Sequence, residues 1–133
     1  MVNVITGILP PSSGTVEFMG ERIDSLAGLV RLSSVVMAEL WRGATRGAER
    51  TFLEILEKNY PVLTPTEQNW LDSGRLLAKI RHGMGFSPDK LRDLHFDVLI
   101  ALTARTCGAQ LITSDRIDFE LIRKYRKFDL VIW

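Results

Sequence analysis

Apolar residues recur along this chain in two patterns, one of short β-branched runs and one of helical spacing. The short runs predict strands at residues 2–9, 29–33, 110–113 and 130–133. Apolar positions three to four residues apart predict helices at residues 35–44, 48–59, 65–82, 87–94, 97–107 and 118–125. Helices that separate short buried strands are typical of a parallel sheet covered on both faces. The pattern therefore predicts an α/β fold, with a central, mainly parallel sheet flanked by helices.

Local signals refine three of the helix ends. Ser34 is predicted to cap the helix that follows the second strand. Thr64, followed by Pro65 and then Glu67, has the pattern of a capping box. Gly108 is predicted to end the helix that contains Asp97, because a residue without a Cβ suits a left-handed C-terminal cap.

Length and composition indicate an ordinary globular domain. The chain has 133 residues, of which 46% are hydrophobic and 25% charged, so we expect a single domain over 1–133. A net charge of +1 gives no argument for nucleic-acid binding from the overall field, although local basic patches stay open. No apolar run approaches the roughly 20 residues that span a bilayer. The single cysteine, Cys107, is interpreted as a reduced core thiol, which favours a cytoplasmic protein without membrane contact.

Candidate chemistry lies where predicted strands end and helices begin. Glu39, Asp97 and Asp115 all fall at such places, and ligands of parallel α/β sheets gather at the carboxyl ends of the strands. Carboxylate oxygens suit Mg²⁺ or Mn²⁺, which activate water and neutralise charge on a phosphodiester. Each acid also has a purely structural alternative: Glu39 can face solvent, Asp97 can cap its helix, and Asp115 and Asp118 can serve as turn and cap residues.

Two segments carry a family resemblance. LSSVVMAELWRGA, at residues 32–44, resembles the second acidic motif of PIN-domain nucleases, and RDLHFDVLIALTARTCGAQLITSDRIDF, at 92–119, resembles their third motif with the strand and the final acidic element that follow. The style of residues 30–133 is similar to that of VapC-type toxins of toxin–antitoxin pairs. The resemblance implies a PIN-like three-layer sandwich and a ribonuclease that uses Mg²⁺ or Mn²⁺. It also implies an antitoxin partner, whose tail enters the acidic groove, and a homodimer.

The same resemblance assigns roles to individual residues. Glu39, Asp97 and Asp115 map onto acids that hold the metal, and Asp118 maps onto a further catalytic acid of the last motif. Thr113 maps onto a small polar residue that supports the site.

The chain departs from the family pattern in its first segment. The family's first acid lies at the end of the first strand, but residues 1–28 contain no matching motif. Among the first dozen residues, side-chain oxygens occur only on Asn3, Thr6 and Ser12, and none carries charge. Phe96 also stands where many relatives have Asn before the acid. Loss of one carboxylate lowers the charge available to a cation and can reduce the rate by orders of magnitude.

The N-terminal segment has a different resemblance. Residues 5–26 resemble the stretch that follows the phosphate-binding loop of ABC-transporter ATPases. The loop itself, G-x-x-x-x-G-K-[ST], is absent from the chain, so no ATP site is expected.

Three hypotheses follow from these observations. The first is a metal-dependent endoribonuclease that hydrolyses RNA phosphodiesters, with a nearby Arg or Lys holding the phosphate backbone. The second is a catalytically impaired PIN module that acts through antitoxin binding or dimerisation, and the missing first acid motivates it. The third, an ATPase-related function, depends on residues 5–26 alone.

Overall fold

The fold is built on a sheet of five parallel strands. In this computed structural model, the described residues are 3–6, 17–18, 21–22 and 30–133. The strand order is β5-β4-β1-β6-β7. The strands are β1 (Asn3–Ile5), β4 (Val30–Ser33), β5 (Val62–Leu63), β6 (Gln110–Thr113) and β7 (Leu130–Ile132). A separate antiparallel pair is formed by β2 (Glu17–Phe18) and β3 (Glu21–Arg22).

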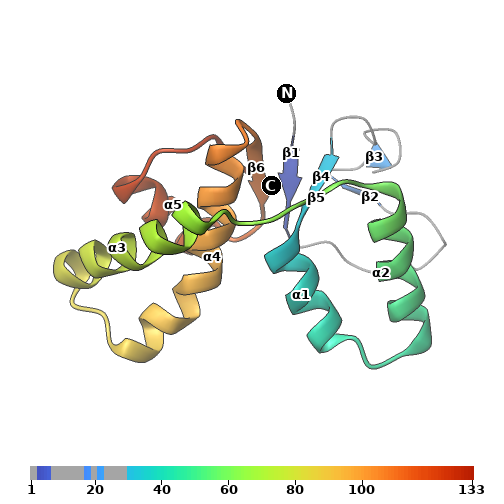
Figure 1. The fold of residues 1–133 in the computed structure, drawn as a ribbon, viewed down its shortest axis with the longest axis horizontal. Helices are drawn as coiled ribbons and strands as arrows, with labels where there is room; N and C mark the ends of the chain where they lie inside the picture. The colour runs from blue at the N-terminus through green and yellow to red at the C-terminus, as the bar shows by residue number, and fades with distance from the viewer. Residues whose placement is uncertain (1–2, 7–16, 19–20, 23–29) are drawn as a thin grey trace.

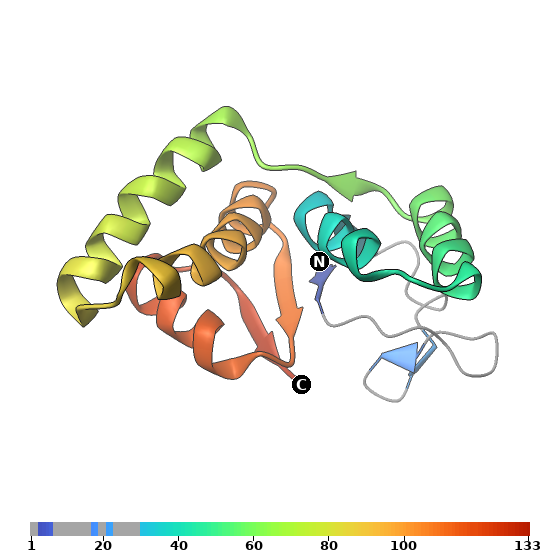
Figure 2. The same cartoon turned by 90° about the horizontal axis from the view of Figure 1, so that it is seen from below.

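Helices cover both faces of the sheet, which confirms the predicted three-layer α/β fold. The helices are α1 (Ser34–Gly43), α2 (Gly47–Asn59), α3 (Glu67–Met84), α4 (Pro88–Thr106) and α5 (Arg116–Tyr125). α1 and α2 lie together on one side of the sheet, and α3, α4 and α5 lie on the other (Figures 1 and 2).

The central strand, β1, joins two hydrophobic clusters. Successive side chains of a strand point to opposite faces, so Val4 packs into the cluster beneath α3, α4 and α5 while Ile5 packs into the cluster beneath α1 and α2. On β6, Leu111 and Ile112 divide in the same way, in register with Val4 and Ile5. Because both faces are covered, these strands read as continuous apolar runs rather than as alternating ones.

One continuous helix replaces the two segments predicted around Asp97. α4 runs from Pro88 to Thr106. The side chain of Ser87 caps it by accepting a hydrogen bond from the backbone N–H of Lys90, and Pro88 occupies the first turn. The prediction that Asp97 opens a helix was therefore wrong. Asp97 lies in the middle of α4, and it cannot act there as an N-terminal cap.

Two predicted caps are displaced along the chain. Ser33, not Ser34, caps α1, because its Oγ accepts from the backbone N–H groups of Val35 and Val36. Thr66, not Thr64, caps α3.

The capping box of α3 also differs from the predicted one, because it uses an amide instead of Glu67. The Thr66 side chain accepts from the Asn69 backbone, and the Asn69 side chain accepts from the Thr66 backbone, both at 3.0 Å. Asn69 is buried, and its side-chain amide also donates to Thr106 Oγ1 at 2.9 Å, which links the start of α3 to the end of α4.

Other predictions have mixed outcomes. Gly108 has φ of 65°, as expected for a left-handed residue after a helix. Cys107 is exposed, so its interpretation as a core thiol was wrong. Most of residues 5–26, the segment that resembles an ATPase fragment, lies outside the described residues. Among the described helices, none is long and apolar enough to cross a membrane.

The two candidate caps of α3 predict different effects of substitution. Thr66→Ala should lower the free energy of unfolding by about 1 kcal/mol, because it leaves a backbone N–H at the helix start without its partner. Thr64→Ala should have a smaller effect, since Thr64 Oγ1 accepts only an exposed bond from Ser34. Urea unfolding of both variants measures the difference, and equal losses would contradict this assignment of the cap.

Candidate metal centre

The candidate site lies at the point where the chain reverses its direction across the sheet. From β1 the chain adds β4 and then β5 on one side, and it returns to add β6 and β7 on the other. Ligand sites of open α/β sheets form at the carboxyl ends of the strands beside such a point. Here Thr6 directly follows β1, Thr113 is the last residue of β6, and Asp115 comes two residues later.

Hydroxyl groups tie the two strand ends together. The Thr6 hydroxyl donates to Thr113 Oγ1 at 2.6 Å, and the Thr6 backbone N–H donates to the Ile112 carbonyl at 3.0 Å. Thr113 Oγ1 also accepts from the Asp115 backbone N–H at 3.1 Å. Thr113 is buried, so its contacts fix the turn that carries Asp115. Thr113, which the sequence resemblance assigns as a supporting residue, lies between Thr6 and the Asp115 turn.

Three carboxylates converge above these strand ends. Asp97 comes from α4, Asp115 caps the start of α5, and Asp118 lies in the first turn of α5. One oxygen of each lies within 4.8 Å of the others. The Asp115 carboxylate also accepts from the Asp118 backbone N–H at 3.3 Å, so it serves as cap and as member of the group together.

Glu39 faces the same space from α1 but stands outside this tight group. A cavity of about 220 Å³ is lined by Glu39 together with Asp97 and Asp115, and Thr6 and Thr113 line it too. The sequence prediction placed Glu39, Asp97 and Asp115 on the metal. The structure brings Asp97 and Asp115 together with Asp118 and places Glu39 in the surrounding wall.

The electrostatics of the group show that it lacks positive charge. Burial, together with repulsion from the neighbouring carboxylates, raises the pKa of Asp97 from its ordinary value of 3.8 to about 7, and burial is the larger cause. Asp115 contributes most of that repulsion, followed by Asp118 and Glu39, while Lys90 opposes it. Burial also raises the pKa of Glu39, and the charge of Arg42 partly offsets this effect.

Lys90 is the residue that sequence reasoning missed. Its Nζ lies 3.2 Å from Asp118 Oδ1, and the ammonium also lies 5.9 Å from the centre of the Phe86 ring. Lys90 precedes Asp97 by seven residues, about two turns of helix, so both side chains share one face of α4. That spacing could have revealed Lys90 if the helix had been predicted as continuous.

The donor set fits a hard divalent cation. Carboxylate oxygens are the preferred ligands of Mg²⁺ and Mn²⁺, and clustered carboxylates with a raised pKa gain most from a neighbouring positive charge. One lysine beside three acids, with a fourth acid across the cavity, leaves negative charge that a cation can neutralise.

A second, more apolar cleft adjoins the acids. Its volume is about 340 Å³, and Glu39 and Arg42 lie at its polar side. Apolar lining comes from Val35, Trp70 and Phe96, and the last two are 50% and 42% exposed. Phe96 is therefore a surface residue of this cleft.

Comparison with known proteins agrees with this architecture. A family model described as the PIN domain matches residues 3–125. No curated protein matches the sequence.

Three solved structures have similar folds. A VapBC2 from Rickettsia felis, bound to a DNA fragment from its promoter, is 18% identical with a TM-score of 0.64, covering 100% of this chain and 99% of that one. VapBC-1 from nontypeable Haemophilus influenzae is 21% identical with a TM-score of 0.62, covering 100% and 98%. A DNA-bound VapBC from Salmonella typhimurium is 22% identical with a TM-score of 0.59, covering 84% and 80%. At these identities the likeness concerns the fold.

The raised pKa of Asp97 predicts how stability depends on pH. Below pH 3.8 the carboxyl is protonated in the folded and the unfolded chain. As the pH rises toward about 7, the unfolded chain loses this proton first, so stability falls across that window. Asp97→Asn should remove this loss and, in chelator at pH 8, should raise the free energy of unfolding relative to the parent by roughly 2 kcal/mol, allowing for partial exposure.

Urea unfolding of the parent and the variant at pH 4.5 and pH 8 provides the measurement. Asp93→Asn, an exposed acid one turn earlier on α4, is the matched control and should leave the profile unchanged. A constant difference between Asp97→Asn and the parent at both pH values would contradict the assignment.

Proposed function

The chain belongs to the PIN-domain family, and from this membership we propose that it is a metal-dependent endoribonuclease, the toxin of a toxin–antitoxin pair. The observation that carries the proposal is the group formed by Asp97, Asp115 and Asp118 at the carboxyl ends of the central strands. The likeness to VapBC structures supports the toxin assignment.

Asp97 and Asp115 are the proposed core of the metal site, because the sequence pattern names both and their carboxylate oxygens lie within 4.8 Å of each other and of Asp118. Asp118 and Glu39 are the candidates for the remaining protein contacts. A bound Mg²⁺ or Mn²⁺ would activate water and neutralise charge on the phosphodiester.

The protein's own residues supply positioning and charge. Thr113 holds the Asp115 turn in place through its hydrogen bond to the backbone. The ammonium of Lys90 lies at the edge of the group, paired with Asp118. If Asp118 binds the cation instead, Lys90 can donate a hydrogen bond to a phosphate oxygen of RNA. Asp97, the most strongly perturbed acid, is the residue whose ionised form the cation would favour most.

A specific observation favours a second candidate, an impaired PIN module that acts by binding. Thr6 lies at the end of β1, where the family pattern has its first acid, and its neutral hydroxyl is engaged with Thr113. The group therefore has one carboxylate fewer than the pattern, which lowers its attraction for a cation. According to this second proposal, the protein functions by binding an antitoxin or a second copy of itself.

The apolar cleft beside Glu39 supports an antitoxin partner. An apolar segment can cover Trp70 and Phe96, and an arginine at its end can reach the carboxylates in place of a metal. A homodimer stays a prediction. Phe52 on α2 is buried, whereas Trp70 on α3 is exposed, so the surface around Trp70 is the better candidate for such a contact. An RNA target and an antitoxin partner both place the proposed activity in the cytoplasm.

Cleavage of RNA tests the first candidate. The parent should cleave a mixed single-stranded RNA in the presence of Mn²⁺ or Mg²⁺. Cleavage should stop when EDTA is added. Asp97→Asn should reduce the rate by about 100-fold or more, because it removes charge at the centre of the group. Asp93→Asn should retain activity. Cleavage that continues in EDTA would contradict the proposal.

Restoring the missing acid separates the two candidates. Thr6→Asp adds a carboxylate to the cavity wall and should lower the Mn²⁺ concentration needed for half-maximal cleavage by about tenfold. Thr6→Asn, of the same size without the charge, is the control. A silent parent with an active Thr6→Asp variant would favour the impaired module, and silence in both would exclude a latent nuclease.

A further inference from the structure

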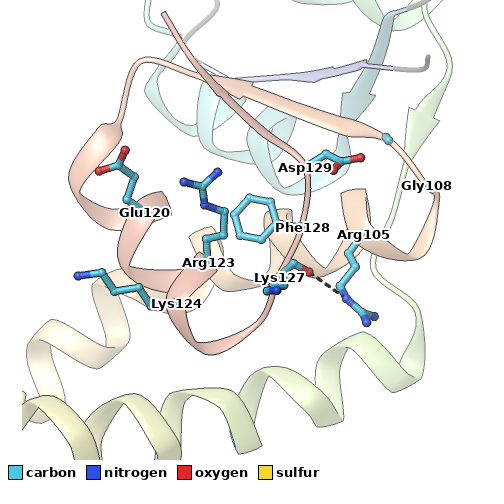
Figure 3. A pocket seen from close by; sticks show the side chains of 9 residues that line it. Arg105, Gly108, Glu120, Arg123, Lys124, Lys127, Phe128 and Asp129 are labelled. Carbon is cyan, nitrogen blue, oxygen red and sulfur yellow. Dashed lines mark hydrogen bonds between the residues drawn. The ribbon is translucent and has the colours of Figure 1, made fainter.

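A third, larger cleft lies at the opposite end of the sheet from the acids. Its volume is about 940 Å³, and it is formed where α4 and α5 end and β6 and β7 begin. Figure 3 shows its side chains, with the Phe128 ring lying in this view between Arg123 and Arg105.

The cleft is basic. Arg105, Arg123, Lys124 and Lys127 line it, against the acids Glu120 and Asp129. Glu120 is already paired with Arg116, at 3.1 Å. Within the part of the chain that the structure describes, none of the four cations has an ion-pair partner. The Nε of Arg105 donates to the Lys127 carbonyl at 3.1 Å, which leaves the other donors of its guanidinium for a ligand.

Favourable interaction with helix dipoles accounts for the positions of three of these four cations, but not for that of Lys127. Arg105 lies in the last turn of α4, and Arg123 and Lys124 lie in the last turn of α5, where cations stabilise the free carbonyl groups. Lys127 belongs to the connection between α5 and β7, so it has no such role. Phe128, beside it, is only partly buried against the core and leaves ring surface toward the cleft.

A flat aromatic ring among free cations suits one class of ligand in particular. Single-stranded nucleic acid binds by stacking bases on aromatic rings while Lys and Arg hold its phosphates. An acidic peptide would use the cations but gain little from the ring.

The position of the cleft links it to the acidic group. α5 begins at the cap Asp115 and ends beside Arg123 and Lys124, so its two ends carry the two sites. A helix of 10 residues spans about 15 Å. A strand of RNA lying along α5 can therefore reach both.

We propose that this basic cleft, centred on Arg105, Lys127 and Phe128, binds a single-stranded segment of the RNA at a distance from the phosphodiester that is cut. The inference depends on the proposed ribonuclease function for the identity of its ligand. It adds a binding site that the acidic group does not need for cleavage.

The test measures binding without cleavage. A fluorescein-labelled 20-nucleotide single-stranded RNA is titrated with the parent in EDTA at several salt concentrations. Arg105→Gln combined with Lys127→Gln should weaken binding about tenfold or more, and the slope of log K against log salt should fall by about 1.4, the value for two lost phosphate contacts on a single strand. Phe128→Leu should weaken binding several-fold with little change of slope.

The control carries the same loss of charge elsewhere. Arg50→Gln combined with Lys58→Gln removes two exposed cations from α2, one of them in its last turn, and should bind as the parent does. Circular dichroism of each variant confirms that it is folded.

Three results would overturn the inference: equal affinity of the cleft variant and the parent, equal weakening by the α2 control, or competition by polyglutamate as strong as competition by unlabelled RNA. The last would identify an acidic protein as the ligand. Cleavage of a four-nucleotide RNA, too short to reach the cleft, should be the same in cleft variant and parent. A parent that binds RNA through the cleft but never cuts it would uphold the inference while refuting the proposed nuclease.

Discussion

Repulsion among carboxylates is the constraint on which the functional end of this molecule depends. Asp97, Asp115 and Asp118 converge within 4.8 Å, and burial together with mutual repulsion raises the pKa of Asp97 to about 7. Such an arrangement costs stability, and it persists only because rigid surroundings maintain it. Here the Thr6–Thr113 hydrogen bond and the buried strands β1 and β6 hold the backbone, while Lys90 offsets part of the charge. The remaining deficit of positive charge is what would give the proposed metal site its affinity for a cation.

The sheet explains why these acids meet although they are far apart in the sequence. Asp97 belongs to a helix that packs on one face, whereas Asp115 follows a strand next to β1. β1 contributes only a short run, but Val4 and Ile5 fill opposite hydrophobic clusters, so its position is fixed from both sides. Thr6 is carried into the cavity as a consequence. Because the backbone of β1 is fixed, the side chain at position 6 always lines the cavity. Whether it is neutral or acidic therefore changes the charge of the site.

Sequence patterns predicted the α/β fold, and they named Asp97 and Asp115 as candidate site residues, but they failed where several local signals compete. The spacing of apolar residues changes around Leu94, so the sequence pattern predicted two helices. In the structure α4 is one continuous helix that packs on α3 and on the sheet. That error hid Lys90, which is related to Asp97 by helical spacing alone. Thr64 and Thr66 both match a capping preference, and the choice depends on Asn69, whose buried amide also binds Thr106 on another helix. The convergence of Asp118 with Asp97 depends on tertiary geometry, which no spacing in the sequence specifies.

The two ends of α5 differ in charge in a way that favours a direction for a bound polyanion. Asp115 caps the helix start and Asp118 lies in its first turn, where Arg116 is already paired with Glu120. Arg123 and Lys124 lie in the last turn, and Lys127 lines the same cleft. Without a metal, the acidic end repels phosphate and the basic end attracts it. RNA would then be held at the cleft before the acidic end can accept it, and a cation at the carboxylates would remove the barrier. Capture and cutting would thus respond differently to metal, because the charges that govern them lie at opposite ends of one helix.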